Sequence, residues 1–199
     1  MTELGLISVS LRNQHNLSKL PSFNMKAGSA TIRASHNARR RPSMDINPEV
    51  TLIYLDICCF NRPFDDQSQL LVRLQTEAKL DIQQSVREGK LALVWSAVLD
   101  LENTANPDIE RSKVINGWKP LAIIDIEPTP QVESLAEEFS SMGVKPMDAL
   151  HAASAIVAGA TYLITTDKQL LKKTVVEPRI CVIDPVDFIK TQQEKLHEN

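Results

Sequence analysis

The stretch TLIYLD, residues 51–56, is a short apolar run with β-branched and aromatic side chains that ends in an aspartate. These properties predict a buried β-strand. Four later runs share this character: LALVWS (91–96), LAIIDI (121–126), TYLITTD (161–167) and RICVID (179–184). Because the runs are continuously apolar rather than alternating, we expect strands covered on both faces, as in a parallel sheet.

Helical patterns separate these strands. Leu70, Leu74, Ala78, Ile82 and Val86 recur every four residues and predict the buried face of a long helix, with Gly89 as a left-handed cap after its end. Further helices are predicted at 97–105, 108–118, 130–142 with Gly143 past the end, 146–160, 167–173 and 185–196. The alternation predicts a three-layer α/β/α sandwich with a central, mostly parallel sheet. A functional site is expected at the carboxyl ends of its strands.

Residues 1–48 differ from the rest of the chain, because they are rich in Ser, Asn, Arg and Lys, nearly free of acid, and without a sustained period. Three interpretations stay open: a disordered tail, a misplaced start with translation beginning at Met44, and an organelle transit peptide. The folded domain is expected at 49–195. We expect a cytoplasmic location, or an organelle if the first 43 residues are a transit peptide.

The charge is unevenly distributed. Seven basic residues and one acid lie in residues 1–43, so 15 of the 22 basic and 24 of the 25 acidic residues remain in 44–199, a net charge of −9. This argues against a domain that holds nucleic acid by net charge alone. It leaves room for a local basic patch, or for an acidic site that reaches phosphates through metal ions.

The sequence has no feature that indicates a membrane-spanning or a secreted protein. Three cysteines, two of them adjacent, make no disulfide framework and suit a reducing compartment. No apolar run approaches the roughly 20 residues that span a bilayer, and no secretory signal stands out. We therefore expect no membrane partner.

Four acids fall where the predicted strands end or the next helices begin. Asp56 closes the first strand and Asp167 the fourth, Glu102 lies six residues after Ser96, and Asp148 lies in the first turn of a helix. Each alone has an ordinary alternative: a helix cap, a favourable partner of a helix dipole, or a solvated side chain. Together they predict a carboxylate cluster at one sheet edge. The pKa values of such a cluster would be raised unless a cation neutralised it, and oxygen ligands suit Mg²⁺ or Mn²⁺.

The ordered set resembles the PIN-domain family of metal-dependent nucleases. It comprises an Asp ending the first strand, Ser-x5-Glu after the second, DALHAASA on a helix and ITTD at a strand end, over about residues 51–190. The resemblance is strongest to bacterial single-domain members, including toxin ribonucleases of toxin–antitoxin pairs. It implies an Mg²⁺- or Mn²⁺-dependent endoribonuclease that hydrolyses RNA through metal-activated water. It also implies an antitoxin protein and a homodimer as candidate partners.

The resemblance assigns the catalytic and metal-binding roles to Asp56, Glu102, Asp148 and Asp167. Thr165 matches the hydroxyl two positions before the last aspartate, and Ser96 the serine before the glutamate. Asp100 is a rival for the glutamate's role, but the family's spacing favours Glu102. The family often has Thr or Ser soon after the first Asp, where this chain has ICC, residues 57–59.

Other polar residues near these acids have open interpretations. Arg62 is a candidate for a phosphate contact or a structural surface arginine, and Asn61 for orienting a ligand carboxylate or turning the chain. Cys58 and Cys59 are expected to pack as small hydrophobes rather than bind zinc. His151 lies three residues after Asp148, and packing within the helix is its favoured interpretation over assistance to a metal or phosphate.

Two alternative functions are considered. A PIN-like fold also serves as a non-catalytic module that binds RNA or protein, and the presence of all four acids disfavours this. An aspartyl phosphatase with Asp56 as nucleophile is disfavoured because that chemistry wants DxD and Cys58 stands in the third position.

Overall fold

The computed structural model of the chain describes residues 50–197. The interpretations of the first 48 residues as tail, misplaced start or transit peptide therefore lie outside the described residues. Within 50–197, no helix combines the length and apolar character that crossing a membrane requires.

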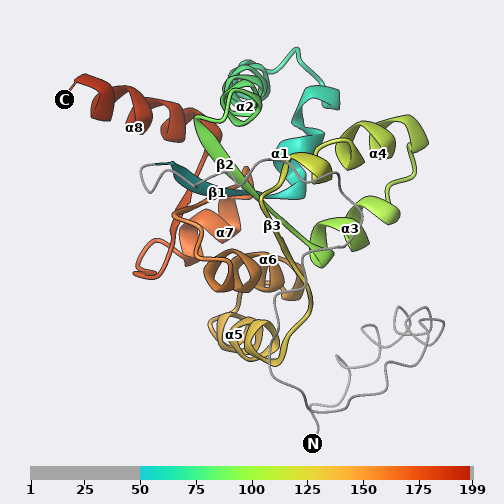
Figure 1. Cartoon of the computed structure of the whole chain (residues 1–199), viewed down its shortest axis with the longest axis vertical. Coiled ribbons are helices and arrows are strands. Elements are labelled where there is room, and N and C mark those ends of the chain that lie inside the picture. Colours follow the sequence, from blue (N-terminus) through green and yellow to red (C-terminus); the bar gives the residue numbers. More distant parts are fainter. Residues whose placement is uncertain (1–49, 198–199) are drawn as a thin grey trace, which may run out of the picture. The chain divides into compact units, whose positions relative to one another are not determined.

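A five-stranded sheet forms the middle layer (Figure 1). Its strands are β1 (Thr51–Leu55), β2 (Leu91–Ser96), β3 (Ile124–Ile126), β4 (Tyr162–Ile164) and β5 (Cys181–Ile183). They lie in the order β3-β2-β1-β4-β5, and every pairing is parallel. The predicted parallel sheet is confirmed. Strands three, four and five are shorter than predicted, and Lys119–Leu121 forms a 3-10 helix, η4, where the third strand was expected to begin.

Helices cover both faces of the sheet. They are α1 (Ile57–Asn61), η3 (Arg62–Phe64), α2 (Leu70–Arg87), α3 (Ala97–Thr104), α4 (Ile109–Asn116), α5 (Pro130–Ser141), α6 (Pro146–Val157), α7 (Lys168–Lys173) and α8 (Pro185–His197). In Figure 1 the sheet is seen nearly edge-on, with α2 and α8 on one side and α5, α6 and α7 on the other. The three-layer α/β/α sandwich is therefore confirmed.

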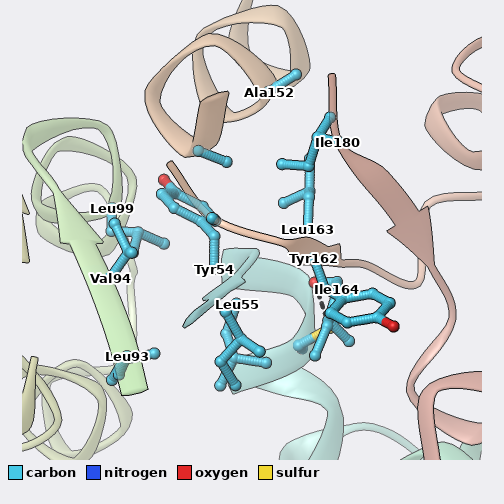
Figure 2. Close-up of a cluster of buried hydrophobic side chains, with 14 of the residues drawn as sticks. Tyr54, Leu55, Leu93, Val94, Leu99, Ala152, Tyr162, Leu163, Ile164 and Ile180 are labelled. Carbon is cyan, nitrogen blue, oxygen red and sulfur yellow. Dashed lines mark hydrogen bonds between the residues drawn. The ribbon is translucent and has the colours of Figure 1, made fainter. Parts of the chain in front are cut away.

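The inner strands form the centre of the core. Ile53, Tyr54 and Leu55 of β1 are completely buried, as are Leu93 of β2 and Leu163 of β4. Figure 2 shows that successive side chains of β1 point to opposite faces: Tyr54 points toward helix α6 and Leu55 away from it. This alternation follows from the strand backbone, and it places the Tyr54 hydroxyl on the α6 side of the sheet.

The buried face of α2 differs from the prediction. Ile82 and Val86 are buried, but Leu70 and Leu74 are exposed. A strict spacing of four residues advances about 400° around a helix with 3.6 residues per turn, so the predicted stripe drifts around the helix. The inward face instead contains polar residues near its middle: Gln75, Thr76, Lys79 and Gln83.

The chain order of the strands locates a crevice. From β1 the chain moves outward to β2 and β3, and then returns to the other side of β1 with β4 and β5. Such a reversal leaves a gap at the carboxyl ends of the strands, where α/β proteins bind ligands. Here the reversal lies between β1 and β4, the strands followed by Asp56 and Asp167.

Candidate functional site

Asp56 lies at the carboxyl end of β1 and is fastened to β4. Its backbone N–H donates to the Ile164 carbonyl (3.0 Å), which continues the strand pairing by one residue. The residue as a whole is only 4% exposed. Its Oδ2 accepts a hydrogen bond of 2.6 Å from the Thr165 hydroxyl and one of 3.2 Å from the Cys58 thiol. One carboxylate oxygen is thus held, while Oδ1 faces His151.

Thr165 connects two of the predicted acids. Its buried hydroxyl donates to Asp56 and accepts the Asp167 backbone N–H (3.0 Å). Cys58 contacts the same hydroxyl (3.3 Å). Cys59 is fully buried as expected, and its thiol donates to the Ile164 carbonyl (3.2 Å). Cys58 belongs to the polar surroundings of Asp56.

Glu102 reaches the same place from α3, where its Oε2 lies 2.6 Å from His151 Nε2. Its rival Asp100 is engaged elsewhere, because it accepts hydrogen bonds from the Trp95 indole (2.8 Å) and from Lys119 (2.6 Å). The structure therefore brings Glu102, rather than Asp100, to Asp56.

His151 is the group that the preferred sequence interpretation missed. It is 1% exposed, and its Nε2 lies 3.7 Å from Asp56 Oδ1 as well as against Glu102. Burial by itself would lower the pKa of His151, but the charge of Asp56 and the hydrogen bond and charge of Glu102 outweigh it and raise the pKa. The signal for its place was its spacing of three residues from Asp148, which puts both on one helix face.

A buried polar chain holds the other side of the imidazole. Nδ1 lies 2.7 Å from the Tyr54 hydroxyl, which lies 2.6 Å from Ser96 Oγ. Ser96 also caps α3 by accepting the Leu99 backbone N–H (3.4 Å). Burial raises the pKa of Tyr54 well above its usual value, so the phenol stays neutral. Ser96 therefore supports the site through Tyr54 and His151.

Asp148 and Asp167 form an outer half of the site with Lys145, a residue that the sequence did not single out. Lys145 Nζ lies 3.2 Å from Asp167 Oδ2 and 3.8 Å from Asp148 Oδ2. Burial, and next the charge of Asp167, raises the pKa of Asp148. Burial would also raise the pKa of Asp167, but the backbone N–H groups of Leu170 and Gln169, together with Lys145, lower it.

Asp167 also serves as an ordinary helix cap. Its Oδ1 accepts the N–H groups of Gln169 (2.6 Å) and Leu170 (3.0 Å) at the start of α7. The cap fixes the carboxylate and leaves Oδ2 directed to Lys145.

The side chains of Arg62 and Asn61, the other two candidate residues, form no hydrogen bond or ion pair with the four acids within the described part of the chain. The Arg62 guanidinium pairs with Asp65 (2.9 Å) and with none of the four acids. The Asn61 side-chain oxygen is buried without a hydrogen-bond partner. Neither observation links these two residues to the acids.

The inner half of the site has the donor set of a metal centre. Single ligand atoms of Asp56, Glu102 and His151 all lie within 4.8 Å of one another. A divalent ion that binds two adjacent ligands at about 2.1 Å holds them about 3 Å apart, and the present separations of 2.6 and 3.7 Å lie on either side of that value. These residues therefore fit a divalent cation with small side-chain movements.

Comparison with known proteins gives one family match. Residues 93–176 match the family model of the PIN domain. Fourteen chains of solved structures match this chain. One belongs to the crystal structure of VapBC2 from Rickettsia felis bound to a DNA fragment from their promoter, with 14% identity and a TM-score of 0.43, covering 66% of this chain and 97% of that chain. No curated protein matches the sequence significantly.

Proposed function

Because residues 93–176 match the PIN domain, we place the chain in the PIN-domain family and propose that it is a metal-dependent endoribonuclease. The observation that carries the proposal is the meeting of buried Asp56 and half-buried Glu102 at the carboxyl edge of the sheet. Asp148 and Asp167 stand beside it with one lysine. The substrate class is RNA and the cation Mg²⁺ or Mn²⁺.

Asp56 and Glu102 would hold the cation, with Asp148 and Asp167 as the outer ligands. A divalent ion bound there would lower the pKa of a water bound to it and would stabilise negative charge on the phosphoryl group. His151 and Lys145 lie against these carboxylates. The site therefore keeps its acids together although like charges repel.

The protein's own part is to orient these acids. Thr165 and the Ile164 carbonyl hold Asp56 by its side chain and its backbone. The α7 N-terminus holds Asp167. Lys145 is the exposed cation of the site and would contact a backbone phosphate of the substrate. The antitoxin partner and the homodimer stay predictions of the family resemblance, and the cytoplasmic location stays a prediction from the sequence composition.

The test is RNA cleavage by the full chain with Mg²⁺ or Mn²⁺, and with EDTA. We expect Asp56→Asn and Glu102→Gln each to lower the rate by about a hundredfold or more, because each removes an anionic ligand. Asp100→Asn is the matched control on α3, since Asp100 contacts Trp95 and Lys119 instead, and its rate should stay near wild type.

Two results would count against the proposal. Cleavage that persists in EDTA or in Asp56→Asn would refute the assigned site. An intact protein that binds RNA without cutting it, with either metal, would support the alternative of a non-catalytic RNA-binding module.

A further inference from the structure

The imidazole of His151 faces the carboxylates with Nε2, at the point where the proposed function requires a cation. We propose that His151 is itself a ligand of that cation, through Nε2, and that the site therefore selects a transition-metal dication such as Mn²⁺ over Mg²⁺. The inference rests on the proposed function, because it concerns the same metal, and it names the ion that the site prefers.

The first support is position. His151 belongs to α6 and is fully buried, yet its Nε2 reaches Glu102 at 2.6 Å and Asp56 at 3.7 Å. Both carboxylates come from other elements, the end of β1 and helix α3. Three ligand atoms from three elements thus share one small space, and one of them is nitrogen.

The second support is the hydrogen bond at Nδ1, on the opposite edge of the His151 imidazole. Histidines that bind metals almost always donate their other N–H to a fixed acceptor, which sets the tautomer and the ring orientation. Here Nδ1 lies 2.7 Å from the Tyr54 hydroxyl, which is fully buried in the sheet. Tyr54 points toward α6 from the centre of the core (Figure 2), and its ring meets the imidazole edge-on at 5.6 Å between centroids.

Tyr54 and Ser96 can satisfy either hydrogen arrangement. Without a metal, Nε2–H donates to Glu102. A neutral ring then accepts the Tyr54 hydroxyl at Nδ1 while Tyr54 accepts from Ser96, whereas a protonated ring donates Nδ1–H to Tyr54. With a metal, the ring carries its hydrogen on Nδ1 and donates it to the Tyr54 oxygen, and the Tyr54 hydroxyl turns to Ser96 Oγ. The distances of 2.7 and 2.6 Å suit both arrangements, because each hydroxyl can donate or accept.

The choice of ion follows from the donor atoms. Carboxylate oxygens alone suit Mg²⁺, which prefers an oxygen shell and keeps several waters. An imidazole nitrogen shifts the preference toward first-row transition metals. One buried and one half-buried carboxylate with one imidazole therefore favour Mn²⁺, or a metal later in that row, over Mg²⁺.

The experiment titrates the EDTA-stripped full chain with Mg²⁺ and with Mn²⁺ by calorimetry, and records pulsed electron spin resonance of the Mn²⁺ form. His151→Gln offers an amide oxygen in place of Nε2, and Tyr54→Phe removes the acceptor for Nδ1. Tyr162→Phe is the matched control, because its hydroxyl lies on the neighbouring strand β4 and accepts from Lys195 (2.9 Å).

We expect Mn²⁺ coupled to ¹⁴N in wild type. The coupling is lost in His151→Gln, and the ratio of Mn²⁺ to Mg²⁺ affinity falls by about tenfold or more. Tyr54→Phe lowers the ratio by less and Tyr162→Phe leaves it unchanged. If His151→Gln does not fold, wild type with ¹⁵N-labelled histidine decides, because its coupling must change from ¹⁴N to ¹⁵N.

Two outcomes overturn the inference, and they are distinguishable. If Mn²⁺ binds without nitrogen coupling, or with an unchanged ratio in His151→Gln, His151 is only a counter-charge and the nuclease proposal still stands. If wild type binds neither ion, the proposed function fails as well.

Discussion

Lys79 offers a quantitative test of the fold, because its amine is buried in α2 without an anionic partner. The side chain is 5% exposed, and Nζ lies 5.8 Å from the centre of the Phe60 ring. No carboxylate within residues 50–197 forms an ion pair with it. Burial lowers the pKa of Lys79 from 10.5 to about 8.

The size of the effect follows from that pKa. Each pKa unit corresponds to about 1.4 kcal/mol, so charging Lys79 costs the folded state about 3 kcal/mol. Because the folded pKa is the lower one, the unfolded chain binds more protons between about pH 8 and about pH 10.5. The free energy of unfolding therefore rises with pH across this window. The cost is complete below about pH 8 and absent above about pH 10.5.

Lys79→Met keeps most of the side-chain volume and removes the ammonium. In urea unfolding of the full chain at about pH 7, we expect the variant to be about 3 kcal/mol more stable than wild type. At about pH 10 that advantage should shrink by about 2 kcal/mol, because wild-type Lys79 has then lost its proton in the folded state.

Lys113→Met is the control, since Lys113 is an exposed lysine of α4 that pairs with Glu110 (2.7 Å). Its stability difference from wild type should not change over the same pH range. The reasoning fails if Lys79→Met is no more stable than wild type at about pH 7, or if its advantage is the same at both pH values.

Three further predictions concern the site and the helices. Thr165→Val removes the hydroxyl that holds Asp56, so RNA cleavage should slow by about tenfold or more and the free energy of unfolding should fall by about 1–3 kcal/mol. A wild-type cleavage rate would contradict the role assigned to Thr165. Lys145→Gln removes the ammonium beside Asp167, and calorimetry should show Mg²⁺ binding at least about threefold tighter rather than weaker. Asp108→Ala removes the cap of α4, and thermal unfolding should show a loss of about 1 kcal/mol, whereas an unchanged melting temperature would argue against the cap.

Local patterns in the sequence predicted the sheet and its partner helices well. Continuous apolar runs such as TLIYLD and LALVWS do become buried parallel strands, because a strand covered on both faces has no polar side. Gly89 and Gly143 adopt the positive φ that follows a helix end. The inward face of α2 escaped prediction because a spacing of four residues does not track the helical period.

The acids were predicted to gather at one edge because parallel strands all end there, and sequence order alone carries that argument. The family's spacing favoured Glu102 over Asp100, and the tertiary structure supplies the physical reason, since Glu102 lies on the side of α3 that meets His151 and Asp100 on the side that meets Trp95. The structure alone also brings Lys145 against Asp167, 22 positions away, and His151 against Asp56, 95 positions away. Hydrophobic periodicity depends only on neighbouring residues in the sequence. The partner of a buried charge depends on how distant elements pack together.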